Sequence, residues 1–137
     1  MFFTKVCVLG AVSLGMIAAV FGFQDQQDTH QTTSVFMQKK LDYSREIVAG
    51  LATEDFAKIS KSAQDMMILS HEADWKVITT PEYLKASNDF RETVARLRQA
   101  GKEKNLDGAT IAYFEVTLNC VRCHKQLRNQ QKRVRNR

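Results

Sequence analysis

The fold of this chain is limited most by the spacing of its apolar residues, which recur every three or four positions in four separate stretches. That spacing places them on one face of an α-helix. No stretch alternates apolar and polar residues over a sustained length, so the sequence predicts no strand. The chain of 137 residues is therefore predicted to be all-α, with helices over residues 34–50, 53–75, 80–105 and 107–129.

The predicted helices begin at polar residues that can cap a helix. Ser34, Thr53 and Asp107 each precede an apolar stripe, and acidic residues follow Thr53 directly. Thr80 precedes Pro81, which suits the first position of a helix. Four amphipathic helices joined by short connections predict an antiparallel up-down-up-down four-helix bundle.

The fourth predicted helix contains the motif Cys120-Val121-Arg122-Cys123-His124. Two thiols at i and i+3, followed at once by an imidazole, have the spacing of covalent c-type haem attachment. The thiols can add to the two haem vinyl groups, and His124 can donate a ring nitrogen to the iron. The motif therefore predicts one covalently bound haem c on the last helix, held by Cys120, Cys123 and His124.

Other interpretations of the two cysteines remain open. A structural zinc site would need a second Cys or His pair, which the sequence lacks. A thioredoxin-like pair would need a βαβ context. A structural disulfide between Cys120 and Cys123 is the third alternative.

The helix that carries the motif is apolar over much of its circumference. One stripe contains the haem-attachment residues, and a second consists of Ile111, Phe114, Leu118 and Val121. A helix with so wide an apolar surface is expected to be largely buried. We therefore expect the first stripe to meet the haem and the second to meet neighbouring helices.

The N-terminus has the pattern of a secretory signal. Lys5 precedes an uncharged apolar run, and cleavage is expected after Gly22. The predicted organisation is a signal peptide over 1–22, a flexible linker over 23–33, the helical domain over 34–129 and a basic tail over 130–137. The length of the run leaves an uncleaved membrane anchor as an alternative. Export agrees with haem attachment outside the cytoplasm, and implies a transient attachment machinery as partner.

Charge is concentrated at the C-terminus. The last thirteen residues hold six Lys or Arg and no acid, whereas the whole chain has a net charge of +5. In an exported haem protein this favours an acidic redox partner or anionic lipid over nucleic acid. The alternative interpretation is a solvated, frayed terminus with no partner. The sequence offers no paired carboxylates and no nucleophile with a base, so we do not expect an enzyme.

The helix count and the motif from Cys120 to Arg128 resemble the cytochrome c-prime family and its low-spin relatives. A basic residue one turn after the haem His is common in that family, and Arg128 stands there, within reach of a haem propionate. The resemblance implies a periplasmic or otherwise extracytoplasmic location. It also implies electron transfer or the binding of small gases, and homodimers through outer helices are frequent.

The family divides on the sixth iron ligand. Low-spin relatives use a Met early in the first helix, and Met37 stands at that place on the apolar face. The resemblance thus implies an electron carrier whose iron is held by His124 and Met37. If Met37 only packs, the alternative is a five-coordinate protein that binds NO or CO. Met66, Met67 and His71 are the competing candidates for the ligand.

Overall fold

The computed structural model describes residues 34–72 and 80–136, and these residues form a four-helix bundle. The first helix covers residues 34–52 and is followed by α2 (Phe56–Leu69), α3 (Pro81–Lys102) and α4 (Leu106–Arg135). The prediction of an all-α bundle is confirmed. The predicted signal peptide and linker lie outside the described residues.

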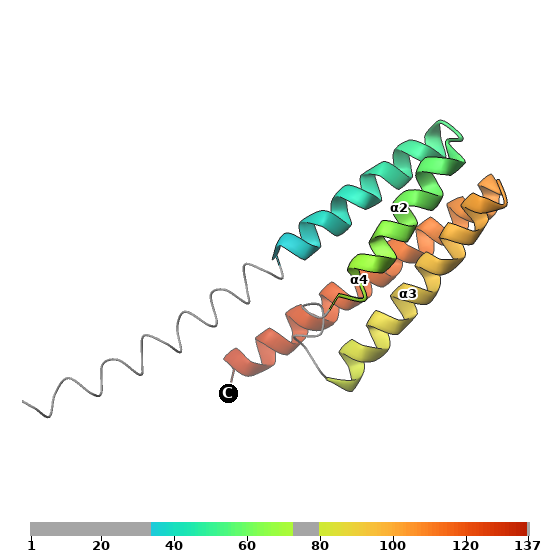
Figure 1. Cartoon of the computed structure of the whole chain (residues 1–137). Coiled ribbons are helices and arrows are strands. Elements are labelled where there is room, and N and C mark those ends of the chain that lie inside the picture. The colour runs from blue at the N-terminus through green and yellow to red at the C-terminus, as the bar shows by residue number, and fades with distance from the viewer. Residues whose placement is uncertain (1–33, 73–79, 137) are drawn as a thin grey trace, which may run out of the picture.

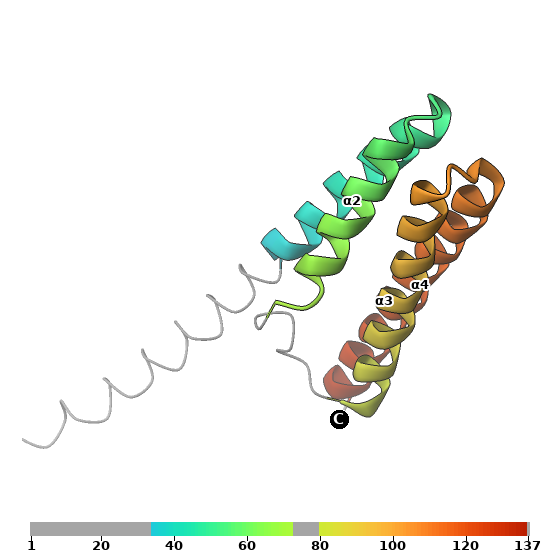
Figure 2. The ribbon, with the colours of Figure 1, turned by 45° about the vertical axis from the view of Figure 1, so that its right-hand side comes forward.

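The four helices run antiparallel to their neighbours in the chain (Figure 1). Figure 2 shows the first helix beside α2, and α3 beside α4. α3 also packs against α2, so it joins the two pairs. No helix in the described part of the chain is both long and apolar enough to cross a membrane.

The start of α3 confirms the prediction made from Thr80 and Pro81. The Thr80 hydroxyl accepts a hydrogen bond from the backbone N–H of Tyr83, at 3.3 Å, and Pro81 is the first helical residue. Thr80 is extended, at φ −66° and ψ 144°, as a residue before proline prefers. The sequence signal is strong here because a proline is tolerated in the first turn of a helix but not in its interior, so a helix in this stretch has to begin close to Pro81.

The start of α2 differs from the prediction. Thr53 is not the cap, because its hydroxyl donates back to the carbonyl of Ala49 at 2.9 Å. The cap is Asp55, whose carboxylate accepts from the N–H of Lys58 at 2.9 Å. Between them Glu54 has a φ of 52°, which reverses the chain after the first helix.

The ends of α2 and α4 also differ from the predicted ones. α2 was expected to continue to residue 75 but ends at Leu69, where Ser70 forms the C-cap. α4 was expected to end near Asn129 but continues to Arg135, so most of the predicted basic tail is helical. No Gly or Pro interrupts this stretch, and cations in the last turn stabilise the helix dipole.

The N-cap of α4 is Asn105 rather than Asp107. The Asn105 side chain accepts a hydrogen bond from the N–H of Gly108 at 2.8 Å. Asp107 lies in the first turn, where its charge favours the helix dipole. The cap is therefore two residues earlier than predicted, which is the usual size of error for a helix boundary.

The main core lies between all four helices. Its fully buried side chains include Ile47, Ile59, Val94, Leu97 and Val116. Two glycines permit the helices to approach closely at Ile59. A Cβ on Gly50 would lie 2.8 Å from Cγ1 of Ile59, and one on Gly101 would lie 3.1 Å from the backbone nitrogen of Ser60.

The second apolar stripe of α4 is not buried, contrary to the prediction. Ile111, Phe114 and Val121 are 63%, 64% and 55% exposed. α4 contacts α3 through Asn119 and the first helix through Tyr113, and both contacts lie on its inner side. The stripe lies on the opposite side, so a wide apolar surface did not mean burial on all sides.

Candidate functional site

A small cluster of buried side chains brings together residues from all four helices. Phe36, Leu69 and Tyr83 form its buried part, and they come from the first helix, α2 and α3. Met37 and Cys123 pack against this cluster from the first helix and α4. The structure thus places the predicted sixth ligand and one predicted haem cysteine at the same cluster.

The pairing of the first helix with α4 explains this placement. The hydroxyls of Ser44 and Tyr113 lie 2.9 Å apart and form a hydrogen bond. Met37 precedes Ser44 by seven residues, and Cys120 follows Tyr113 by seven. The two helices are antiparallel, so two turns back along the first helix and two turns forward along α4 lead toward the same end of the bundle. Met37 and Cys120 therefore lie at the same level.

Lys40 is a residue of this site that the sequence analysis missed. Its ammonium lies 3.7 Å from the centroid of the Phe90 ring, which is a cation–π contact. Desolvation by the surrounding protein lowers the pKa of Lys40 to about 7, and the nearby Cys120 and Cys123 oppose that shift. Lys40 follows Phe36 by four residues on the inner face, and this spacing was the available signal.

The two cysteines of the motif are free thiols in this structure. Although Cys120 is partly open to solvent, neighbouring side chains desolvate both thiols, and this raises the pKa of Cys120 and of Cys123. Lys40 acts in the opposite direction on each pKa. Burial thus favours the neutral thiol form of both cysteines, and the ammonium of Lys40 favours the thiolate.

The described residues offer no alternative metal site. No three His, Cys, Asp or Glu side chains among them lie close enough together to hold a metal ion. Cys120, Cys123 and His124 are thus not joined by a further metal-ligating side chain from residues 34–72 or 80–136. The same three groups satisfy the needs of covalent haem attachment, which uses two thiols and one axial nitrogen.

The other candidate residues differ in burial and in their distance from the motif. His124 and Arg128 are both exposed, one turn apart on α4. Met66 is buried in the main core, whereas His71 is exposed beyond the end of α2. Met37 is thus the candidate sixth ligand that shares a cluster with the motif.

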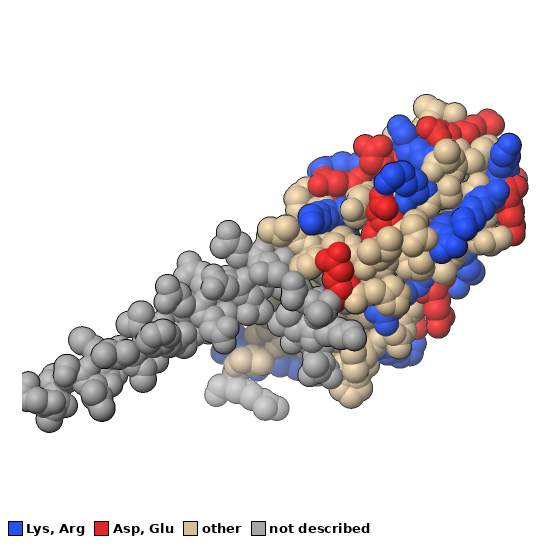
Figure 3. All heavy atoms as spheres, viewed as in Figure 1, with Lys and Arg blue, Asp and Glu red and all other residues tan. Residues whose placement is uncertain are grey.

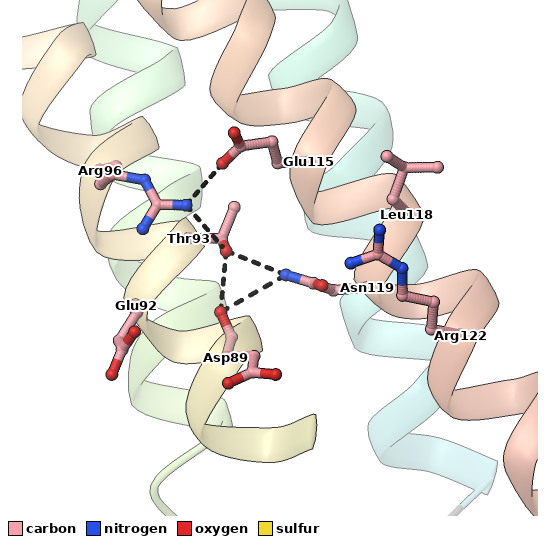
Figure 4. Close-up of a pocket in the computed structure, with 8 residues that line it drawn as sticks. All are labelled: Asp89, Glu92, Thr93, Arg96, Glu115, Leu118, Asn119 and Arg122. Carbon is pink, nitrogen blue, oxygen red and sulfur yellow. Dashed lines mark hydrogen bonds and ion pairs between the residues drawn. The ribbon is translucent and has the colours of Figure 1, made fainter. Parts of the chain in front are cut away.

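A polar cleft of about 410 Å³ lies between α3 and α4, on the side of α4 that carries Arg122 (Figure 4). Arg96 forms an ion pair with Glu115 across the cleft. Asn119 donates a hydrogen bond to the Thr93 hydroxyl at 2.9 Å. These contacts join α3 directly to α4, so they fix the position of α4 against α3.

These features define an antiparallel four-helix bundle whose last helix presents a Cys-x-x-Cys-His motif toward the first helix. A solved structure of similar fold is the nitric oxide complex of a variant of cytochrome c prime from Alcaligenes xylosoxidans. The two structures superpose with a TM-score of 0.61 over 72% of this chain and 92% of that one, at 17% sequence identity. No protein-family model and no curated protein sequence matches the chain. At this identity the likeness concerns the fold.

Proposed function

We propose that this chain is an exported monohaem c-type cytochrome that carries electrons. The proposal rests mainly on one observation, the packing of Met37 and Cys123 against the same buried cluster. The shared fold with a cytochrome c prime supports it. In this account thioethers to Cys120 and Cys123 hold one haem c, and His124 is the proximal ligand.

The bound haem would supply an iron that accepts and releases one electron. The chain's own residues would set the conditions for that exchange. Phe36 and Tyr83, which are 8% and 6% exposed, provide an apolar wall that keeps water from the ring. Exclusion of water disfavours the higher charge of the ferric state and so raises the reduction potential.

Met37 is proposed as the sixth ligand. It is half-buried, one residue from Phe36, and it packs against the cluster that Cys123 also contacts. Thioether and imidazole ligation would raise the reduction potential relative to two imidazoles. Arg128, one turn beyond His124, is proposed to pair with a haem propionate.

The expected partners follow from location and charge. The proposed signal peptide would export the chain to the periplasm or another extracytoplasmic space, where an attachment machinery would join the haem. The last turn of α4 contains Lys132, Arg133 and Arg135. This basic end could steer an acidic redox protein toward the carrier, and salt should weaken the effect.

The alternative function is a five-coordinate protein that binds NO or CO, with Met37 only packing. One observation favours it, since the solved structure of similar fold is a nitric oxide complex. Both functions use the same thioethers and the same His124. They differ only in whether a protein ligand closes the second axial position.

Absorption spectra of the reduced protein, with and without CO, distinguish the two functions. A carrier with Met37 ligated should give low-spin bands that CO leaves unchanged. Met37→Ala should convert this spectrum to a high-spin one that shifts with CO. Met67→Ala is the matched control, because Met67 is a half-buried methionine that packs against the main core. A wild-type spectrum that is high-spin and shifts with CO would overturn Met37 ligation.

A further inference from the structure

One side of α4 carries a row of residues that runs along most of the helix. Its members follow one another at alternating intervals of three and four residues, a spacing that keeps them on one side of a helix. We call it the outer row, and it consists of Ile111, Phe114, Leu118, Val121, Lys125, Arg128, Lys132 and Arg135. The first four members are apolar and the last four are basic, so the row has an apolar half and a basic half.

No other part of the described chain covers most of the outer row. Ile111, Phe114 and Val121 are more than half exposed, and Leu118 is partly exposed. The four basic members are exposed as well. A helix in a soluble bundle normally presents polar residues on its outer side, so the apolar half indicates a surface that another molecule covers.

The basic half lies in a part of α4 that has no acidic residue. Asp107 precedes the row at its apolar end, and the last acid of the helix is Glu115, which pairs with Arg96 of α3. None of the four basic members forms an ion pair with another described residue. Like charges three or four residues apart repel each other along a helix. An anionic surface against the row would offset this repulsion.

Other parts of the surface are different. Figure 3 shows acidic and basic side chains interspersed over the face of the bundle that Figure 1 turns to the viewer, and α4 lies behind that face. On α2 and α3, Lys61 pairs with Asp65 and Lys85 pairs with Asp89. An apolar row that continues into unpaired cations is therefore a particular feature of the outer side of α4.

The two halves together favour a lipid surface as the molecule that covers the row. A membrane rich in anionic phospholipid offers acyl chains to apolar side chains and phosphates to cations. The row is about 36 Å long, so a helix lying in the membrane plane brings both halves into contact with it. Nucleic acid would satisfy the basic half only, and long-range steering of an acidic protein does not use the apolar half.

The position of the row agrees with this choice. Cys123 and Leu127 of α4 pack against the cluster of Phe36, Leu69 and Tyr83. They follow Val121 and Lys125 by two residues each, which is a rotation of about 200° around the helix. The row therefore lies on the side of α4 away from the cluster. A lipid surface at the row would leave the candidate haem site open to soluble partners.

We propose that the outer row docks α4 on a membrane surface rich in anionic phospholipid. The apolar half enters the boundary between headgroups and acyl chains, and the basic half contacts the phosphates. Four apolar side chains give a peripheral, reversible attachment rather than insertion across the bilayer. This inference concerns the outer surface of α4 and does not depend on the proposed ligation of the haem.

Sedimentation of the purified, fully processed protein with lipid vesicles tests the proposal. We expect binding to vesicles of phosphatidylglycerol and phosphatidylethanolamine. Binding to vesicles of phosphatidylcholine alone should be at least about tenfold weaker, because their surface has no net charge. Added salt should weaken the binding to the anionic vesicles. A protein that stays in the supernatant with anionic vesicles, or that binds both kinds equally, overturns the proposal.

Phe114→Ser tests the apolar half of the row. It should lower the partition coefficient for anionic vesicles at least about tenfold, because the ring no longer leaves water for the lipid boundary. Val134→Ser is the matched control. Val134 is 77% exposed on the same helix, but it lies two residues after Lys132 and so on the opposite side from the row. Circular dichroism establishes that both variants fold. Equal binding by Phe114→Ser and the wild type overturns the proposal.

Lys125→Gln combined with Lys132→Gln tests the basic half. Two cations fewer at the lipid surface should weaken binding to anionic vesicles at least about tenfold. Lys39→Gln combined with Lys61→Gln removes the same charge from exposed positions of the first helix and α2. This control should change binding by less than about threefold, because charges far from the lipid are screened. Equal losses in the two pairs would show that net charge, rather than the row, drives binding.

The same variants identify a different occupant of the row. The protein could leave anionic vesicles unbound and instead associate with itself or with an acidic redox protein. If Phe114→Ser abolishes that association, the row is a protein interface and the proposal is wrong.

Discussion

The half of the bundle near its two short connections differs from the half that holds the cysteine motif. In the first, Ile47, Ile59 and Leu97 are 0% exposed and belong to a large apolar core. In the second, a small cluster has Met37 and Cys123 at its margin, with both only partly buried. We call these parts the closed half and the motif half.

The closed half mainly stabilises the fold, whereas the motif half holds the groups that can react or titrate. Apolar burial in the closed half stabilises the bundle by about 25 cal/mol for each Å² removed from water. The motif half instead desolvates groups that can react or titrate, such as Lys40 and the two thiols. Desolvated polar groups cost stability, so a tightly packed closed half is needed to hold them in place. The predictions below test this division, from the largest expected effect to the smallest.

Removal of both thiols should abolish covalent haem binding completely. Cys120→Ser combined with Cys123→Ser leaves no sulfur for either thioether, while His124 remains. Haem staining of a denaturing gel measures the loss. The control Val121→Ala, at an exposed position between the two cysteines, should keep full staining. Staining of the double variant equal to wild type would contradict the assignment of the motif.

Truncation of Leu97 tests the closed half. Leu97→Ala should lower the free energy of unfolding by about 2–5 kcal/mol, because a fully buried leucine leaves a cavity. Urea denaturation followed by circular dichroism measures the change. Leu84→Ala, at a residue 45% exposed on the same helix, should cost about 0.5 kcal/mol or less. Equal losses in the two variants would contradict the account of the core.

Filling the space at Gly101 should have a smaller effect. Gly101→Val places side-chain atoms against α2, where a Cβ alone would lie 3.1 Å from the backbone nitrogen of Ser60. We expect a loss of about 1–3 kcal/mol in the free energy of unfolding, because backbone atoms cannot easily move aside. Valine has a higher helix propensity than glycine, so propensity does not cause this loss. Ala95→Val, at an exposed position of α3, measures the effect of a valine that meets no other helix. A loss no larger than that of the control would indicate that the helices separate without cost.

The pH dependence of the haem-free chain tests Lys40. Its pKa is about 7 in the folded chain and 10.5 when unfolded, so unfolding takes up a proton between these values. Stability should therefore rise as pH increases from about 7 to 10.5, by at most about 1.4 kcal/mol per pH unit. Below pH 7 both states are protonated, and Lys40 contributes no further slope.

Lys40→Met should flatten that rise, and Lys39→Met, at an exposed neighbour, should preserve it. Urea midpoints measured from pH 6 to pH 10 in the haem-free Cys120→Ser, Cys123→Ser background provide the comparison. Identical pH slopes with and without Lys40 would show that its ammonium is not desolvated in solution.

The two halves also differ in how well the sequence predicted them. Local signals were sufficient where one residue restricts where a helix can begin, as Pro81 does at the start of α3. They were insufficient at Thr53, because both Thr53 and Asp55 are suited to cap a helix, and the hydrogen bonds select Asp55. Periodicity identified the helices but not their ends.

The motif half depends on contacts between helices, which local patterns do not contain. The motif itself was readable, and so was the inner position of Met37. Lys40 lies over the ring of Phe90 and near the two cysteines of α4, which are distant in the sequence, so its burial could not be predicted from local patterns. The exposure of Phe114 was mispredicted for a similar reason, since an apolar stripe does not say whether the chain itself or another molecule covers it.

Mass spectrometry of the purified, exported protein under denaturing conditions tests the proposed haem attachment most directly. We predict a chain whose mass includes one haem, with the added mass on the peptide that contains Cys120 and Cys123. A peptide of unmodified mass, with its two cysteines as free thiols or joined in a disulfide, would contradict the proposal.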